Sequence, residues 1–146
     1  MTLLDSLQTT LAGEHAAVYL YGVLGAQTPQ SLEPALYEAL VEGYRRHRGH
    51  RDQLTGYVTE AGGVPVAAAA AYALPAQLAN ADQVRRSAIG VEESCAATYS
   101  SLVANSVRAQ RRWAIIALTD AAVRQLSFGG APQDFPGAPD LVPTPN

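Results

Sequence analysis

The chain has 146 residues and a mass of 15.4 kDa, the size of one domain that can bury a core without disulfides or a structural metal. Its net charge of -3 and isoelectric point near 5.5 give no general attraction to phosphate backbones or anionic lipids, so we expect no nucleic-acid partner. The single cysteine, Cys95, excludes an internal disulfide, and no stretch approaches the ~20 uncharged apolar residues of a membrane span, so we expect a cytoplasmic protein with no membrane partner.

Apolar residues in the first half of the chain recur at the three- and four-residue spacing of helix faces. We predict one helix over residues 2–25 and a second over residues 32–61, which is capped by Ser31, has Pro34 in its first turn and ends at Gly62. The first face contains Leu4, Leu7, Leu11, Val18 and Tyr21, and the second contains Leu36, Leu40, Gly43, Leu54 and Tyr57. Because the connection is short, the two helices are expected to be antiparallel.

The segment 62–82, in which Pro65 and Pro75 bracket an alanine run, is too long for a tight turn. A helix of about 28 residues spans about 42 Å. A largely extended segment of about 20 residues can return that whole distance. We therefore predict a crossover that places the third helix parallel to the second.

Two further helices are predicted after the crossover. The third covers residues 82–104, with Asn80 or Asp82 as its N-cap, and the fourth covers residues 107–128, since positions 105–106 are the one convincing break. The predicted core face of the third helix is Val84, Ala88, Glu92, Cys95, Tyr99 and Leu102. The predicted face of the fourth is Trp113, Ile116, Asp120 and Val123.

The predicted domain organisation is a helical bundle over residues 1–128 and a proline-rich tail over residues 129–146, which Phe135 and Leu141 would pin to the bundle. A short loop, a long crossover and a second short loop form the connection pattern of ferritin-like bundles. The predicted fold class is therefore all-α, a ferritin-like four-helix bundle with a long crossover between helices 2 and 3.

Charged and polar residues interrupt the predicted apolar faces. Glu14 lies seven residues from both Leu7 and Tyr21 on the first face, and His47 and His50 lie three residues apart on the second. A carboxylate that faces a core needs a partner, and the two histidines would face Glu14 across the bundle.

The third and fourth helices supply more carboxylates. Either Glu92 or Glu93 fits the face of the third helix, and the choice between them stays open. Asp120 lies in line with Trp113 and Val123 on the fourth. All four helices are thus expected to contribute polar side chains to one region of the interior.

This arrangement of a glutamate, a pair ending in histidine, a glutamate and an acid on successive helices resembles the ferritin-like di-iron carboxylate proteins. The segments EHAAVYLYG, YRRHRGHRD, VPVAAAAAYALP and DAAVR more closely resemble an alanine-rich ferritin-like domain of unknown function from actinobacteria. That resemblance covers nearly the whole chain. It implies the fold and carries no assigned biochemistry.

The chain departs from the di-iron pattern at several ligand positions. His47 stands where the second helix should carry a glutamate, Asp120 replaces a glutamate, and Val123 occupies the place of the second histidine. The candidate metal ligands are Glu14, His47, His50, Glu92, Glu93 and Asp120. Two histidines with carboxylates suit a single Fe(II), Mn(II) or Zn(II) ion, and no other cofactor is indicated.

Three functions remain open. The leading interpretation is a structural or interaction bundle, expected to be a homodimer, in which an eroded di-iron site has become a buried polar network. Arginines considered for that network are Arg46, Arg51 and Arg124. The second interpretation is a metal-binding redox protein, and the third is a small-ligand binder in which an arginine pairs with an anion.

The remaining conspicuous residues are given structural roles. The tyrosines are expected to fill the core and donate hydrogen bonds to its carboxylates. Cys95 is interpreted as a small buried hydrophobe and His15 as a residue packed at a helix interface. The arginines at positions 45, 46, 48 and 51 are expected to pair with neighbouring acids, and the crossover to cover the bundle.

Overall fold

The computed structural model describes residues 1–141, and these form four long α-helices, one short 3-10 helix and no strand. The elements are α1 (Leu3–Ala26), α2 (Pro34–Glu60), α3 (Ala81–Asn105), α4 (Arg108–Ser127) and the 3-10 helix Pro139–Leu141. The predicted all-α fold class is confirmed, and each helix lies within two residues of its expected bounds. Positions 142–146 of the predicted tail lie outside the described residues.

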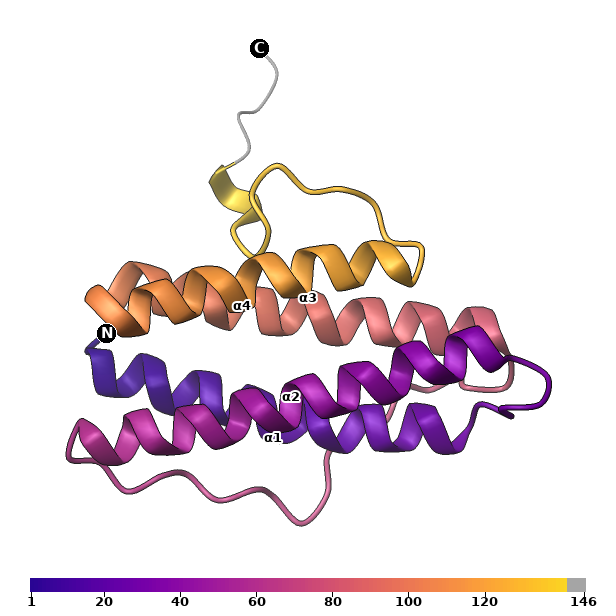
Figure 1. Ribbon diagram of the computed structural model, residues 1–146, viewed down its shortest axis with the longest axis horizontal. Coiled ribbons are helices and arrows are strands. Elements are labelled where there is room, and N and C mark those ends of the chain that lie inside the picture. Colours follow the sequence, from indigo (N-terminus) through magenta and orange to yellow (C-terminus); the bar gives the residue numbers. More distant parts are fainter. Residues whose placement is uncertain (142–146) are drawn as a thin grey trace.

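The four helices pack with their long axes roughly aligned (Figure 1). α1 packs against α2 and α3, and α3 packs against α4. α1 and α2 are antiparallel, as are α3 and α4, whereas α2 and α3 run in the same direction because the crossover (residues 61–80) returns along the outside of the bundle. The long crossover between the second and third helices is therefore confirmed.

The helix ends follow local capping chemistry, with one correction. Asn80 caps α3 as predicted, because its side chain accepts a hydrogen bond from the Gln83 amide. Ser31, however, does not cap α2. The amides of residues 32 and 33 bond to the Pro29 carbonyl at 3.1 and 2.9 Å, which makes a separate turn before the helix. α2 then begins at Pro34, which needs no partner for an amide hydrogen.

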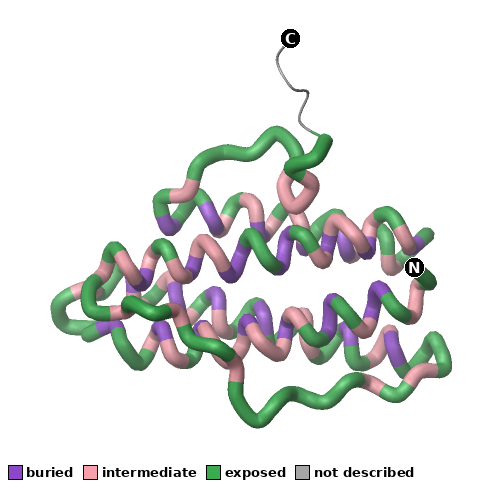
Figure 2. Tube along the Cα trace, turned by 180° about the vertical axis from the view of Figure 1, so that it is seen from behind, coloured by how far each residue is buried: buried purple, intermediate pink, exposed green. Residues whose placement is uncertain are grey.

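The crossover is attached to α1 by side chains. Gln8 donates to the Val64 carbonyl at 2.6 Å and accepts from the Val66 amide at 2.9 Å. The His15 ring lies 3.0 Å from the Val66 carbonyl, so this histidine contacts the crossover. The Tyr72 ring packs on Tyr19 with centroids 5.4 Å apart. These contacts hold the crossover against the bundle while most of its own residues stay exposed (Figure 2).

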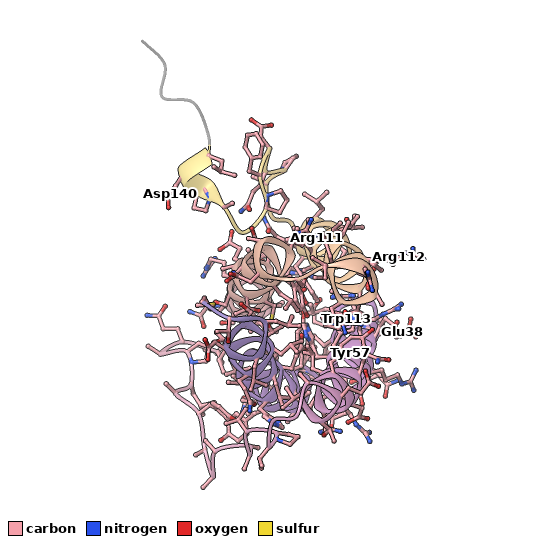
Figure 3. All side chains as sticks on the ribbon, turned by 90° about the vertical axis from the view of Figure 1, so that its left-hand side faces the viewer. Glu38, Tyr57, Arg111, Arg112, Trp113 and Asp140 are labelled. Carbon is pink, nitrogen blue, oxygen red and sulfur yellow. The ribbon has the colours of Figure 1, made fainter. Side chains whose placement is uncertain are left out.

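The core faces of α1, α2 and α3 are close to the predicted ones, and every predicted face residue of α3 is buried. The predicted face of α4 is wrong. Ile116 and Val123 are 61% and 60% exposed, and the buried face consists of Ala114, Ala117, Ala121 and Gln125. Small alanine side chains allow α3 and α4 to pack closely, which turns the larger aliphatic residues outward. Trp113 sits at the edge of the interior beside Tyr57 (Figure 3).

The tail beyond α4 packs on α3 through backbone instead of large side chains. Phe135 and Leu141 are 43% and 63% exposed, so neither pins the tail as predicted. Gly137, with a positive φ of 72°, lies directly on the Ala96 backbone, and a Cβ at that position would collide with it. Within the described residues, no helix is long and apolar enough to cross a membrane.

Candidate functional site

Polar side chains from all four helices meet in the middle of the bundle. We call this group the buried polar cluster; it consists of Glu14, Tyr21, His47, His50, Glu92, Tyr99 and Arg124. The side chains of Glu14, His47 and Glu92 have no exposed surface, and those of His50 and Arg124 are 13% and 10% exposed. The cluster is therefore largely closed to solvent.

The imidazole of His47 lies between two carboxylates. Its Nδ1 is 2.8 Å from Glu14 Oε2, and its Nε2 is 3.1 Å from Glu92 Oε1. Since a carboxylate oxygen only accepts hydrogen bonds, both ring nitrogens must carry hydrogen for both contacts to be favourable. The geometry is that of an imidazolium held by one carboxylate from α1 and one from α3.

Two phenols also donate hydrogen bonds to the carboxylates. Tyr99 donates its hydroxyl hydrogen to Glu14, and Tyr21 donates to Glu92. His50 Nδ1 lies 2.9 Å from the Tyr99 hydroxyl oxygen, which accepts because its own hydrogen is committed to Glu14. The expectation that tyrosines bond to core carboxylates is met at both positions.

The position of Tyr21 depends on the absence of a side chain on α2. Its ring packs on Gly43, where a Cβ would collide with the ring. The same ring stacks on His47 with centroids 5.1 Å apart. The glycine four residues before His47 thus creates the space that lets Tyr21 reach Glu92.

Arg124 of α4 supplies the second cation of the cluster. Its Nε donates to Glu92 Oε1 at 2.9 Å, and its Nη2 lies 3.8 Å from Asp120 Oδ2. Two carboxylates, Glu14 and Glu92, therefore face two cations, protonated His47 and Arg124. The fully buried part of the cluster is electrically balanced by its own side chains, as buried charges require.

The contacts determine the protonation states. Burial by itself would raise the pKa of the Glu14 carboxyl, but the hydrogen bond with His47 and the proximity of the His50 ring outweigh burial and lower that pKa to about 2. Burial also opposes protonation of His47, yet its neighbours Cys95, Glu14 and Glu92 raise the imidazole pKa well above its usual value. The pKa of Glu92 is lowered against the effect of burial, chiefly by His47. At neutral pH both carboxyls are ionised and His47 is protonated.

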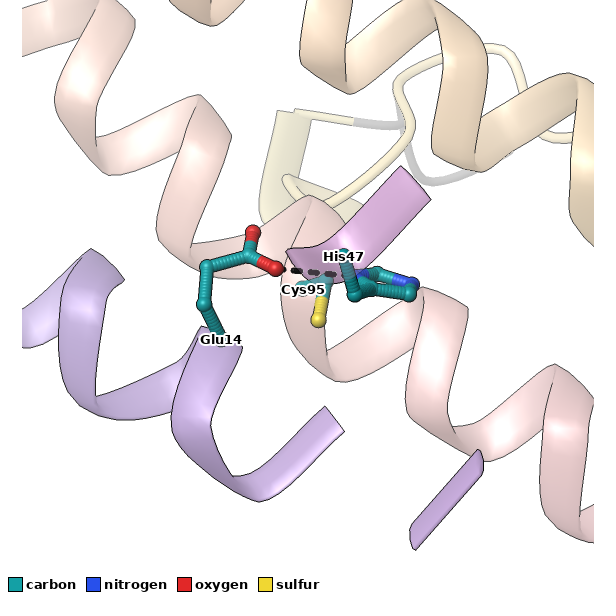
Figure 4. Close-up of side chains that lie close together, drawn as sticks. All are labelled: Glu14, His47 and Cys95. Atoms are coloured by element: carbon teal, nitrogen blue, oxygen red, sulfur yellow. Dashed lines mark hydrogen bonds and ion pairs between the residues drawn. The ribbon is translucent and has the colours of Figure 1, made fainter. Parts of the chain in front are cut away.

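Cys95 of α3 lies beside the cluster (Figure 4). Its Sγ, a ring nitrogen of His47 and a carboxylate oxygen of Glu14 all lie within 4.8 Å of one another. Burial raises the pKa of the thiol to about 11, so it is protonated at neutral pH. One sulfur, one nitrogen and one oxygen donor form a combination that Zn(II) accepts.

The comparisons with known proteins place the chain in a family. The sequence model of a domain of unknown function, DUF4439, matches residues 6–140. The chain belongs to this family. Among solved structures it is similar to the crystal structure of the conserved hypothetical protein rv2844 from Mycobacterium tuberculosis, with a TM-score of 0.78 and 30% identity, covering 86% of this chain and 92% of that chain. No curated protein matches the sequence.

The DUF4439 match spans the whole buried polar cluster, and the structure brings four of the six predicted ligands into it: Glu14, His47, His50 and Glu92. The other two lie elsewhere. Glu93 is exposed and accepts a hydrogen bond from Gln133 of the tail at 3.2 Å. Of the two adjacent glutamates, Glu92 is therefore the one that faces the interior. The Asp120 side chain is 36% exposed and lies 3.5 Å from Arg46 Nε.

The donor set of this DUF4439 chain does not fit a pair of irons. The position expected for the second histidine, Val123, faces outward. Asp120 pairs with Arg46 and Arg124, and Arg124 also places its guanidinium directly on Glu92, where a second metal would need an open carboxylate. A single ion is a different case, since Glu92 Oε2 is buried without a hydrogen-bond partner among the described residues and the donors of Glu14, His47 and Cys95 converge.

Some residues in or beside the cluster were not singled out as site residues from the sequence. Tyr21, Cys95 and Tyr99 occur on the predicted core faces, and their positions three or seven residues from Glu14 or Glu92 are a usable signal. Arg124 was one of three candidate arginines, and no sequence pattern separates it from the other two. The predicted face of α4 placed its neighbour Val123 in the core, whereas Val123 is exposed and Arg124 points inward.

Proposed function

We propose that this chain is a ferritin-like bundle that serves as a structural or interaction module, and that its buried polar cluster is the remnant of a metal site which now works as a metal-free ionic lock between the helices. The observation that supports this proposal most directly is that His47 uses both ring nitrogens on carboxylates from two different helices. An imidazole bound in that way has no lone pair left for a metal.

The charge balance supports the same proposal. Two carboxylates are matched by His47 and Arg124, so an added divalent cation would leave an excess of positive charge in a region without exposed surface. Buried polar networks of this kind specify how helices pack, since any other register leaves charges unpaired. The lock connects α1, α2, α3 and α4 through Glu14, His47, Glu92 and Arg124.

The experiment is a measurement of metal content and of the His47 protonation state on the same preparation, purified without an affinity tag. Elemental analysis before and after anaerobic addition of Fe(II), Mn(II) or Zn(II), with His50→Ala as the comparison, should find no stoichiometric metal in either protein. Nitrogen-15 NMR, with the signal assigned through His47→Gln, should find both ring nitrogens protonated at pH 8. Stoichiometric metal together with an unprotonated ring nitrogen on His47 would exclude the lock.

A second candidate is a mononuclear metal-binding protein, which the convergence of Glu14, His47 and Cys95 donors within 4.8 Å favours. Binding would require His47 to lose a proton and Cys95 to become a thiolate, as metals bring about at protein thiols. The metal-binding alternative predicts tight Zn(II) binding that releases protons and is lost in Cys95→Ser. If the cluster is a metal-free ionic lock, neither the parent protein nor Cys95→Ser should contain metal.

We further propose that the module forms a homodimer through the outer face of α4. That face carries the exposed aliphatic residues Ile115, Ile116, Val123 and Leu126. Large apolar side chains gathered on one exposed face are typical of interaction surfaces, and a twofold axis would bury the same stripe on both copies. Sedimentation velocity should find a dimer that Ile116→Glu converts to a monomer; a monomeric parent protein at high concentration would contradict this.

A further inference from the structure

A cavity of about 570 Å³ lies between α1, α3 and the crossover. Its volume falls within the usual range of small-molecule sites, roughly 300–1,000 Å³. Residues lining it on α3 extend from Gln83 to Thr98, which corresponds to about 22 Å along the helix axis. The cavity is therefore an elongated groove, which we call the crossover groove.

The crossover groove exists because small side chains face each other across α1 and α3. Gly13 and Ala16 line it from α1, and Ser87 and Gly90 line it from α3. A Cβ placed on Gly90 would meet no atom within 4 Å, so the space beside this glycine is open. Larger residues at these positions would let the two helices close the gap with their own side chains.

The crossover forms the outer wall of this groove. Leu74 and Pro75 line it. Just before them in the chain, Tyr72 packs on Tyr19 and so attaches this part of the crossover to α1. Leu74 is nevertheless 51% exposed, as expected for an apolar residue that covers a space instead of a packed core. The long connection thus creates a site in addition to joining two parallel helices.

Charge is present at one end of the groove only. Arg86 is the one charged residue among the described lining residues, and Gln83 and Gln77 lie at the same end. The Arg86 side chain makes no ion pair or hydrogen bond with any described residue. Its neighbour Arg85 differs, because it pairs with Asp82 at 3.3 Å and with Glu33 at 3.4 Å. The groove end therefore offers an uncompensated positive charge.

The inner wall is apolar and chemically inert. Ala17, Val91 and Cys95 line the groove and belong to the buried core. Burial raises the pKa of the Cys95 thiol to about 11, which leaves it protonated and unreactive as a nucleophile. A molecule in the groove would contact an apolar wall over most of its length and meet charge only at Arg86.

We propose that the crossover groove binds a single-chain fatty carboxylate, with its head group at Arg86 and Gln83 and its chain along Ala16 and Gly90 towards Cys95. Charge complementarity selects the anionic head, because a guanidinium binds a carboxylate with paired hydrogen bonds. The elongated shape and the apolar wall select a linear chain. This inference is independent of the metal content of the buried polar cluster.

Isothermal titration calorimetry with dodecanoate and hexadecanoate, below their micelle-forming concentrations, tests the proposal on the full chain. We expect saturable binding of one molecule per chain. Dodecanol and dodecyltrimethylammonium, which have the same chain and a neutral or cationic head, should bind at least tenfold more weakly. Equal binding of all three heads would overturn the assignment of the head group to Arg86, and no carboxylate binding would overturn the proposal as a whole.

Two pairs of variants locate the site. Arg86→Gln should weaken dodecanoate binding at least tenfold, whereas Arg85→Gln, which removes a charge that is already paired, should leave it within about twofold. Gly90→Leu should fill the groove and abolish binding without lowering Tm, since a helix-interior glycine is replaced by a better helix former. Gly56→Leu on α2, where a Cβ also meets no atom within 4 Å, is the matched control and should bind normally.

One further outcome identifies a different occupant. If the protein forms a dimer that Gly90→Leu dissociates and dodecanoate does not, the groove accommodates a second copy and the fatty carboxylate proposal fails. If the oligomeric state is the same in both proteins and only carboxylate binding is lost in Gly90→Leu, the groove is the ligand site.

Discussion

His47 is held in its position as a cation, since each of its ring nitrogens faces a carboxylate oxygen. A neutral imidazole would set one lone pair against Glu14 or Glu92, in a region without exposed surface. The proton on His47 is therefore part of the folded structure. It follows that the free energy of unfolding depends on pH through this one side chain more than through the exposed charges.

The pH dependence has a defined sign. His47 has a folded-state pKa raised above the ordinary 6.5, so its contribution is fully present below pH 6.5 and is lost as pH rises towards the folded pKa. Glu14 has a pKa lowered from 4.5 to about 2, so its contribution is present above pH 4.5 and is lost as pH falls towards 2. Stability should be greatest between pH 4.5 and 6.5 and should fall as the pH is raised from 7 to 8.5.

Urea unfolding across that range measures the effect, with His47→Gln as the control. The variant should be less stable at pH 6 and should lose most of the slope between pH 7 and 8.5. An identical slope in both proteins would mean that His47 is neutral in the folded chain.

Arg124 and Glu92 should be strongly coupled. Removing one partner of a buried ion pair leaves an uncompensated charge, so we expect Arg124→Met to lower the free energy of unfolding by about 3 kcal/mol. Arg46→Met, at a side chain that is 48% exposed, should change it by less than about 1 kcal/mol.

The double variant Glu92→Gln/Arg124→Met completes the cycle, because it removes both charges and leaves Glu14 paired with His47. It should recover at least about 1 kcal/mol relative to the sum of the single changes. Simple additivity in urea unfolding would show that the guanidinium does not stabilise Glu92.

Among the helices, α4 has an orientation that its hydrophobic residues do not predict. Its aliphatic residues Ile115, Ile116 and Val123 face outward, and alanines face α3. Packing between helices depends on how closely their backbones approach, and small residues permit the closest approach. The orientation also brings Arg124 to Glu92, so the close packing of α3 and α4 and the assembly of the buried polar cluster have the same structural origin.

A change of side-chain size tests this orientation. Ala117→Leu adds volume to a position that is 1% exposed, and overpacking there should lower the free energy of unfolding by about 1–3 kcal/mol. Ala109→Leu makes the same replacement at an exposed position of the same helix and should change stability by less than about 0.5 kcal/mol. Thermal unfolding measures both; equal effects would indicate that Ala117 does not face α3.

For the whole molecule, the crossover has two consequences that the four helices alone do not have. It allows α2 and α3 to run in the same direction (Figure 1), in a bundle where polar side chains of all four helices meet. It also covers the space between α1 and α3. Its attachment to α1 is made of a few side-chain contacts and not of a packed core.

The crossover should therefore be released without unfolding the bundle. Gln8→Ala removes both hydrogen bonds to Val64 and Val66, and exposed bonds of this kind contribute about 0.5–1.5 kcal/mol each. We expect faster proteolytic cleavage within residues 64–75, with Tm lowered by less than about 8 °C. Gln53→Ala, at an exposed position of α2, should cleave like the parent protein. Unchanged cleavage in Gln8→Ala would show that these bonds do not restrain the crossover.

Periodicity predicts single helices well and relations between helices poorly. On α3 every residue of the predicted face is buried, and only Val91 and Ala96 are buried outside it, because one side of that helix is uniformly apolar or carries Glu92. On α4 the same method failed, since its alanines carry little hydrophobic signal and its large aliphatic residues are exposed. The tail failed for a related reason: Gly137 holds it by close backbone contact, which no apolar pattern reveals.

The sequence by itself determined the four helices, the long crossover and the presence of Glu14 and two histidines on interior faces, because helix formation and amphipathic spacing are local properties. Only the tertiary structure decided that Glu92 and not Glu93 faces inward, that Arg124 balances it, and that a groove opens beside Gly90. These depend on the rotation of each helix and on the distance between its axis and its neighbours'. Both are settled when all four faces, including their small residues, pack together at once.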